Sequence, residues 1–143
     1  MQTVRLGVSV SDEMTPFDLA MPHDKHDFTS LEPIEVSEPS TWVHLVPELL
    51  IWLQDPNWPI SGRVKEVLLL NPTAVIDPIR LVLEGDDGGW QSNCLDLVLR
   101  LPRDAQGMLR SDLEAFSTRI SDESDLEWHL RSDVKKVLSC LAT

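Results

Sequence analysis

The chain has 143 residues, of which 42% are hydrophobic and five are Trp, and its net charge is −12. This length predicts a single domain that can bury a core without disulfide or metal cross-links. The charge comes from 24 acidic and 12 basic residues, and such an excess repels phosphate backbones and anionic membranes. We therefore expect no nucleic-acid partner and no membrane partner, and a protein partner, in particular a basic one, is favoured.

The N-terminal residues carry no pattern of a secretory signal. Between Met1 and Val10 the only basic residue is Arg5, and no apolar core of a signal peptide follows it. No stretch reaches the roughly 18 apolar residues of a membrane helix. Cys94 and Cys140 both lie in apolar helical patterns without a CxxC spacing, which predicts reduced, buried thiols. The expected location is the cytoplasm.

Residues 1–40 differ in composition from the rest of the chain. Apolar and polar residues alternate over 4–10, which predicts a short strand. Four prolines and many acidic residues follow within 11–40, which predicts an extended or irregular segment with one helical turn at 28–31. We therefore divide the chain into an N-terminal arm, 1–40, and a helical-repeat domain, 41–143.

Helical periodicity begins at Thr41 and continues to the C-terminus. Apolar residues recur at spacings of three and four in six stretches, which are 41–54, 60–68, 75–83, 90–101, 105–120 and 126–141. The connections between them are short, so sequential helices are expected to run antiparallel.

Local signals suggest how two of these helices begin. Pro78 either kinks the 75–83 helix or begins it with Asp77 as the cap. Ser124 and Glu127 fit a capping box for the last helix.

A weak internal repeat accompanies these helices. The pattern Leu53-x-Asp55-x-x-Trp58 is followed, about thirty residues later, by Leu83-x-x-Asp86-x-x-x-Trp90. Repeats of that period are typical of solenoids built from helix pairs. The predicted fold is all-α, with antiparallel helical hairpins stacked as a short superhelix behind an irregular N-terminal arm.

The first candidate binding turn lies between two indoles. Asp55 and Asn57 form a polar turn, with Trp58 beside it and Trp52 one helical turn earlier. Since Trp is enriched at binding hot spots, the turn could be a recognition surface. Alternatively, Asp55 accepts backbone N–H bonds at the start of the next helix and Trp58 packs between helices.

The second candidate turn combines Asp86 and Asp87 with three glycines and precedes Trp90. It lacks the glutamate at the twelfth position that a calcium loop requires. It also lacks the Lys and Ser/Thr that follow a phosphate-binding loop. We therefore interpret it as turn chemistry, with Asp86, Asp87 and Trp90 added to the candidate binding residues.

The segment His23-Asp24-Lys25-His26-Asp27 is the one cluster of metal-capable residues in the sequence. His23, His26 and Asp27 are weak candidate metal ligands, because further ligands would have to come from distant positions. Alternatively, the acidic and basic side chains of this segment cap a helix or pair with the body. We predict no metal centre and no cofactor.

A longer motif resembles a known family. The block Trp52-Leu53-Gln54-Asp55-Pro56-Asn57-Trp58-Pro59 is similar to a motif of the bacterial and fungal family catalogued as domain of unknown function 5071. The resemblance covers roughly residues 20–141 and includes 22–27, Gly89-Trp90 and Leu101-Pro102. It implies helical proteins similar to HEAT repeats, some of which belong with bacterial toxin and immunity systems, and it implies no activity or cofactor. Residues 1–20 lie outside it, and 32–40 is longer and more acidic than the usual linker.

The sequence offers no catalytic residue. It has no Gly-x-Ser-x-Gly motif, no cysteine in an electropositive setting and no recognisable Ser/His/acid set. We therefore expect a non-enzymatic, protein-binding helical scaffold of an immunity or regulatory type. The alternative is a small enzyme that uses acidic residues in a groove between helices, and a third hypothesis is a metal-dependent role for 23–27.

Overall fold

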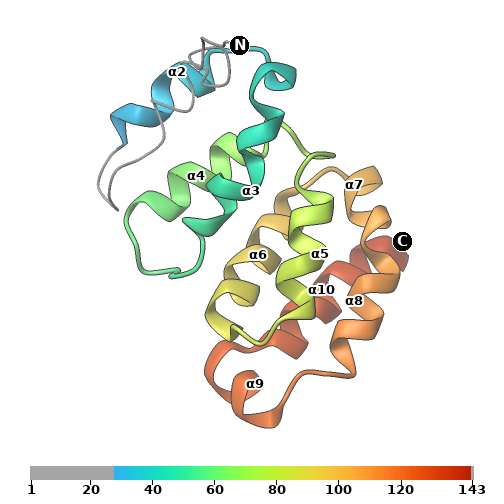
Figure 1. The fold of residues 1–143 in the computed structure, drawn as a ribbon. Coiled ribbons are helices and arrows are strands. Elements are labelled where there is room, and N and C mark those ends of the chain that lie inside the picture. Colours follow the sequence, from blue (N-terminus) through green and yellow to red (C-terminus); the bar gives the residue numbers. More distant parts are fainter. Residues whose placement is uncertain (1–27, 143) are drawn as a thin grey trace, which may run out of the picture.

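The computed structural model describes residues 28–142 of the protein, and this part of the chain contains helices and no strand (Figure 1). The elements in chain order are η2 (Thr29–Leu31), α2 (Glu32–Glu35), η3 (Pro39–Leu45), α3 (Val46–Ile51), α4 (Ile60–Leu68), α5 (Ile76–Glu84), α6 (Gly88–Arg100), α7 (Arg103–Met108), α8 (Arg110–Ser117), α9 (Asp122–Trp128) and α10 (Leu130–Ala142). The predicted all-α fold is confirmed, and the strand predicted at 4–10 lies outside the described residues.

The longer helices pack as successive pairs in two layers (Figure 1). Helix α3 packs on α4, and α5 packs on α6. In one layer α5 contacts α3 on one side and α8 on the other, while in the second layer α6 contacts α10. Hydrogen bonds from Lys65 link α4 to α6 in that second layer. Each pair thus buries its apolar face against the next pair, which neither could do alone.

The core extends into the C-terminal part of the arm. Leu31 and Ile34 are fully buried, so the segment from 28 to 40 packs against the helical body. Trp42, just after the arm, is also fully buried and is the largest buried side chain. Within the described residues its indole N–H has no hydrogen-bond partner.

The helix predicted over 41–54 is two elements. A 3-10 helix runs from Pro39 to Leu45, and the α-helical part begins only at Val46. Pro47 lies in the first turn of α3, where a missing backbone N–H costs nothing. Trp42 leaves helical geometry, with φ −124° and ψ 17°. The apolar spacing was correct, but the proline and the buried indole divide the helix.

The helix predicted over 105–120 is also divided. Helix α7 ends at Met108 and α8 begins at Arg110, and Leu109 between them has φ −101° and ψ 1°. Gly107 lowers helix stability just before this break. Leu109 is fully buried, so the bend turns both short helices toward the same core.

The capping box predicted at Ser124 and Glu127 is wrong. The cap is Ser121, whose hydroxyl accepts the Ser124 N–H at 3.0 Å. A left-handed residue, His129 with φ 56°, ends α9 and separates it from α10. Leu126, expected on the buried face, is therefore 82% exposed.

Two smaller expectations also need correction. Helix α5 begins at Ile76 with Val75 as its N-cap, so Asp77 is not the cap and Pro78 occupies the first turn. Cys94 is buried as predicted, whereas Cys140 is exposed. In α10 the buried positions are Leu130, Val134 and Val137, and Cys140 follows where that helix nears its end.

Candidate functional site: an apolar groove between α3 and α5

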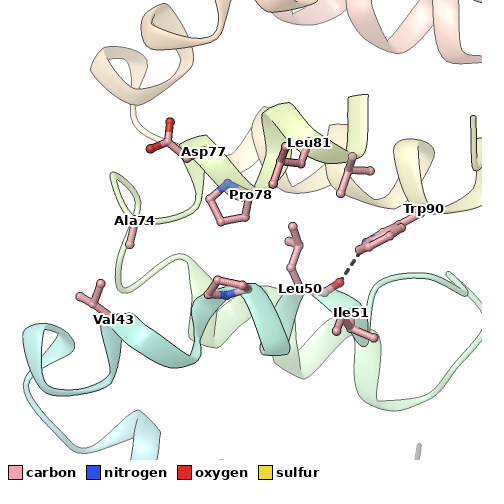
Figure 2. Close-up of a pocket in the computed structure, with 10 residues that line it drawn as sticks. Val43, Leu50, Ile51, Ala74, Asp77, Pro78, Leu81 and Trp90 are labelled. Atoms are coloured by element: carbon pink, nitrogen blue, oxygen red, sulfur yellow. Dashed lines mark hydrogen bonds between the residues drawn. The ribbon is translucent and has the colours of Figure 1, made fainter. Parts of the chain in front are cut away.

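A groove of about 600 Å³ opens between α3 and α5 (Figure 2). Its lining residues are Val43, Pro47, Leu50, Ile51, Ala74, Asp77, Pro78, Leu81, Val82 and Trp90. Side chains from α3 form one wall, side chains from α5 form the other, and Trp90 of α6 stands at one end (Figure 2). A volume in this range is typical of ligand and anchor-residue sites, which span roughly 300–1,000 Å³.

The walls of the groove expose large aliphatic side chains. Leu81 is 70% exposed, Ile51 is 46% exposed and Val43 is 44% exposed. Each lies beside buried residues of the same helix, because positions three or four apart share a helix face. Exposed apolar surface gathered in one hollow is typical of an interaction site, whereas scattered exposed residues are not.

Trp90 fixes one end of the groove to the end of α3. Its indole N–H donates to the carbonyl oxygen of Leu50 at 3.0 Å. One helical turn later in α6, the amide of Asn93 donates to the carbonyl of Leu53 at 3.2 Å. The Leu50 carbonyl also accepts the Leu53 N–H at 3.0 Å, and Leu53 lies just beyond α3, so these two side chains add bonds that hold the C-terminal end of α3 against α6.

Of the candidate binding residues predicted from the sequence, Trp90 alone lines this groove. Asp87 instead caps α6, where its carboxylate accepts the Trp90 N–H at 3.1 Å. Asp86 lines a separate cavity of about 130 Å³. Two glycines of this turn lie against Trp128, since a Cβ on Gly88 would lie 2.7 Å from its ring and a Cβ on Gly89 would lie 3.2 Å from it.

The other predicted residues form a turn of their own. Asp55 accepts the backbone N–H of Asn57 at 2.9 Å, which is the local turn bond that aspartate favours. The rings of Trp52 and Trp58 pack against each other, with centroids 5.8 Å apart and planes at 60°. Both indoles are half-buried. The structure places these four residues outside the lining of the groove.

The groove residues that the sequence analysis missed carry one local signal. Ile51 and Leu81 are large aliphatic residues that fall outside the apolar faces predicted for their helices. Such off-face residues are individually common on protein surfaces. Their position becomes informative only when the fold places both in the lining of one groove.

A second cluster is polar and lies between α4 and α6. Lys65 is only 8% exposed, and its ammonium group donates to Asn93 Oδ1 and to Asp96 Oδ2, both at 2.7 Å. Arg100 also approaches Asp96 Oδ2, at 3.4 Å. This cluster lines neither of the two cavities described above. These bonds join α4 to α6, and removing Asp96 would leave the Lys65 cation without its counter-charge, whereas removing Asn93 would leave it one hydrogen bond short.

Two groups near this cluster have shifted pKa values. Burial raises the pKa of the Asp133 carboxyl above its ordinary value of 3.8, and the negative charge of Asp96 adds to the rise. Burial also raises the pKa of the Cys94 thiol far above its ordinary value. Cys94 is therefore a protonated, unreactive thiol at neutral pH.

The described residues hold no group of three or more His, Cys, Asp or Glu side chains that could bind a metal ion. His23, His26 and Asp27, the weak metal candidates, lie outside the described residues. Asp77 is the one carboxylate among the groove's lining residues, and it pairs with Arg80 at 2.6 Å. Within 28–142, no helix has both the length and the apolar character that crossing a membrane requires.

Comparison with known proteins identifies a family for this chain. A search of curated proteins finds no match to the chain. The family model described as "Domain of unknown function (DUF5071)" matches residues 20–138, which include the groove, the 52–59 block and both Asp-containing turns. That match spans most of the chain, so the protein belongs to this family of domains of unknown function.

Proposed function

We propose that the protein is a non-enzymatic, HEAT-like helical scaffold that binds a partner protein through the groove between α3 and α5. The observation that carries this proposal is the groove itself, an apolar hollow bordered by the exposed side chains of Val43, Ile51 and Leu81. Binding of an apolar segment between two helices is a recurring mode of protein recognition.

The fixed geometry of the walls supports the proposal. Trp90 ties the end of α3 to α6, and Arg80 ties α5 to α8 through Asp112 Oδ2 at 2.9 Å. A groove whose walls are already held loses little conformational freedom when a partner enters. The site is therefore suited to receive protruding apolar side chains without rearranging.

The acidic surface suggests the forms that this function would take. A scaffold with a net charge of −12 attracts basic partners and increases their rate of encounter. Neutralising a basic toxin, as an immunity protein does, is one such form, and regulation of a cytoplasmic partner is another.

The experiment compares capture of partners from the native host by three forms of the protein. The groove variant is Leu81→Glu, and the matched control is Leu126→Glu, which changes a leucine on α9 that is also largely exposed. We expect the wild type and Leu126→Glu to capture the same partner and Leu81→Glu to lose it. Direct binding of the purified partner would then confirm the difference. Equal capture by all three forms would show that the groove is not the binding site.

A further inference from the structure

We infer that the occupant of the groove is an amphipathic protein segment whose apolar side chains enter between α3 and α5 and whose flanking Lys or Arg side chains meet acids on the rim. This inference rests on the proposed protein-binding function and adds the chemistry of the partner. It is carried by the distribution of charge around the exposed apolar residues.

Acidic side chains lie near the exposed edge of each wall of the groove, and these three, Glu48, Asp77 and Glu84, are the rim acids. On α3, Glu48 stands three residues before Ile51. On α5, Asp77 stands four residues before Leu81 and Glu84 three residues after it. Residues three and four apart are neighbours on a helix surface, so the exposed edge of each wall has a carboxylate beside it. All three acids are exposed.

Basic residues are sparse in the segments that form the two walls of the groove. The segment 28–62, which includes the α3 wall, has five acidic residues and no Lys or Arg. On α5 the one basic residue is Arg80. An incoming cation therefore meets unopposed negative charge along one wall and must compete with a single arginine along the other.

Arg80 does not neutralise the rim, because most of its guanidinium is used elsewhere. It donates to Asp112 Oδ2 of α8 at 2.9 Å and to the carbonyl of Met108 at 2.9 Å. Its third contact is Asp77 Oδ1, on a carboxylate that is 87% exposed. Arg80 is one cation shared between the carboxylates of Asp77 and Asp112, so the three side chains together keep a net charge of −1.

The remaining two rim acids have no cation at all among the described ion pairs. Neither Glu48 nor Glu84 takes part in any of those pairs. Charges arranged with one sign around an apolar centre select partners of the opposite sign and reject those of the same sign. The complementary segment has an apolar centre and positive flanks.

The test uses a phage-displayed library of random 16-residue peptides selected on the full chain. Peptides that bind the wild type and fail to bind Leu81→Glu are kept, because they depend on the groove. We expect Lys and Arg to be enriched next to the apolar residues of these peptides. Their affinity should also decrease steeply as salt is raised, since exposed ion pairs are screened.

Charge reversal then locates the contacts. The double variant Glu48→Lys with Glu84→Lys should bind the selected peptides with an affinity about tenfold lower than that of the wild type. The matched control, Glu114→Lys with Glu127→Lys, makes the same change in net charge at exposed positions on α8 and α9 and should leave affinity nearly unchanged. Peptides with their Lys or Arg changed to Glu should recover binding to the rim variant.

The outcomes separate the two proposals. If no selected peptide distinguishes the wild type from Leu81→Glu, the groove does not bind protein segments and the proposed function fails. If groove-dependent peptides are found but are neutral or acidic, and the rim variant binds them as the wild type does, only the inference about charge fails. If both double variants weaken binding equally, the attraction is general and the rim acids have no special role.

Discussion

Helix α5 faces two neighbours in the same layer, and its two sides differ sharply. Toward α8 the seam is closed by polar contacts, in which Arg80 reaches Asp112 and the carbonyl of Met108. Arg119 adds a hydrogen bond from the start of the following loop to the carbonyl of Leu83 at 2.9 Å. Toward α3 the seam is apolar and open.

The two seams of α5 differ in the kind of contact that joins them: the α5–α8 seam has side-chain hydrogen bonds, and the α3–α5 seam is lined by apolar side chains. Among the described hydrogen bonds none joins α3 directly to α5, and the bridge between the end of α3 and the rest of the stack comes from Trp90 of α6. The seam is lined by Pro47, Pro78 and Leu81, whose side chains can donate no hydrogen bond across it. The stack is therefore closed by polar contacts on one side of α5 and open on the other, which is the arrangement on which the proposed binding site rests.

The largest expected effect concerns the support of the α3 wall. Trp42 precedes α3 and is fully buried, so Trp42→Ala should lower the free energy of unfolding by about 3–5 kcal/mol. The neighbouring Val43→Ala, at a 44% exposed position, should cost much less. Denaturant melts of both variants measure this. A small loss for Trp42→Ala would mean that the α3 wall does not depend on the core beneath it.

Substitutions at the closed seam between α5 and α8 should have the next largest effect on stability. Arg80→Ala removes the fork that joins α5 to α8 and should lower the unfolding midpoint by less than Trp42→Ala does, because its hydrogen bonds involve charged partners but its side chain is 36% exposed. Arg80→Lys keeps the charge but not the planar fork and should recover only part of that loss. Thermal and denaturant unfolding test both. An unfolding midpoint of Arg80→Ala equal to that of the wild type would make this pairing an ordinary surface contact.

The open seam should tolerate substitution. Leu81 is 70% exposed, so Leu81→Glu should change the free energy of unfolding by less than about 0.5 kcal/mol. The same variant should lose partner binding, as proposed above. A destabilisation comparable to that of Arg80→Ala would show instead that Leu81 belongs to the core and that the groove closes in solution.

The smallest effects concern pH and lie in the regions flanking this layer. Glu35 accepts from Arg63 at 2.5 Å, and this hydrogen bond lowers the pKa of its carboxyl below the ordinary value of 4.5. Glu35 therefore stabilises the fold above that pH and loses this contribution as the pH falls through the lowered pKa. Glu35→Gln should be destabilising at neutral pH, and its difference from the wild type should shrink in acid.

Asp133 should show the opposite sign. Its raised pKa means that the folded state favours the protonated carboxyl, so the contribution of Asp133 to stability is greatest below pH 3.8 and is lost as the pH rises through the raised value. Asp133→Asn should therefore be neutral or stabilising at neutral pH and lose that advantage in acid. Unfolding curves from pH 3 to pH 8 compare the two variants. Parallel curves for both would show that neither carboxyl is linked to folding.

Much of the fold could be predicted because its signals are local. The helix expected over 60–68 is α4 itself, and those expected over 75–83 and 90–101 differ from α5 and α6 by one or two residues at each end. Proline and the Asp-Gly turn stop these helices regardless of what packs on them. The breaks at Trp42, Leu109 and His129 were missed, because apolar spacing continues through them and only packing decides where the backbone turns.

The sequence by itself determined the helical class, the apolar faces, the acidic surface and the membership of the family, since each depends on composition, periodicity or a contiguous motif. The tertiary structure alone decided that Ile51 and Leu81 face the same hollow. It also assigned Asp55 and Asp87 to turn and cap bonds within their own segments. The physical reason is that a groove is a property of the space between two helices, and residues about thirty positions apart have no local signal that reports it.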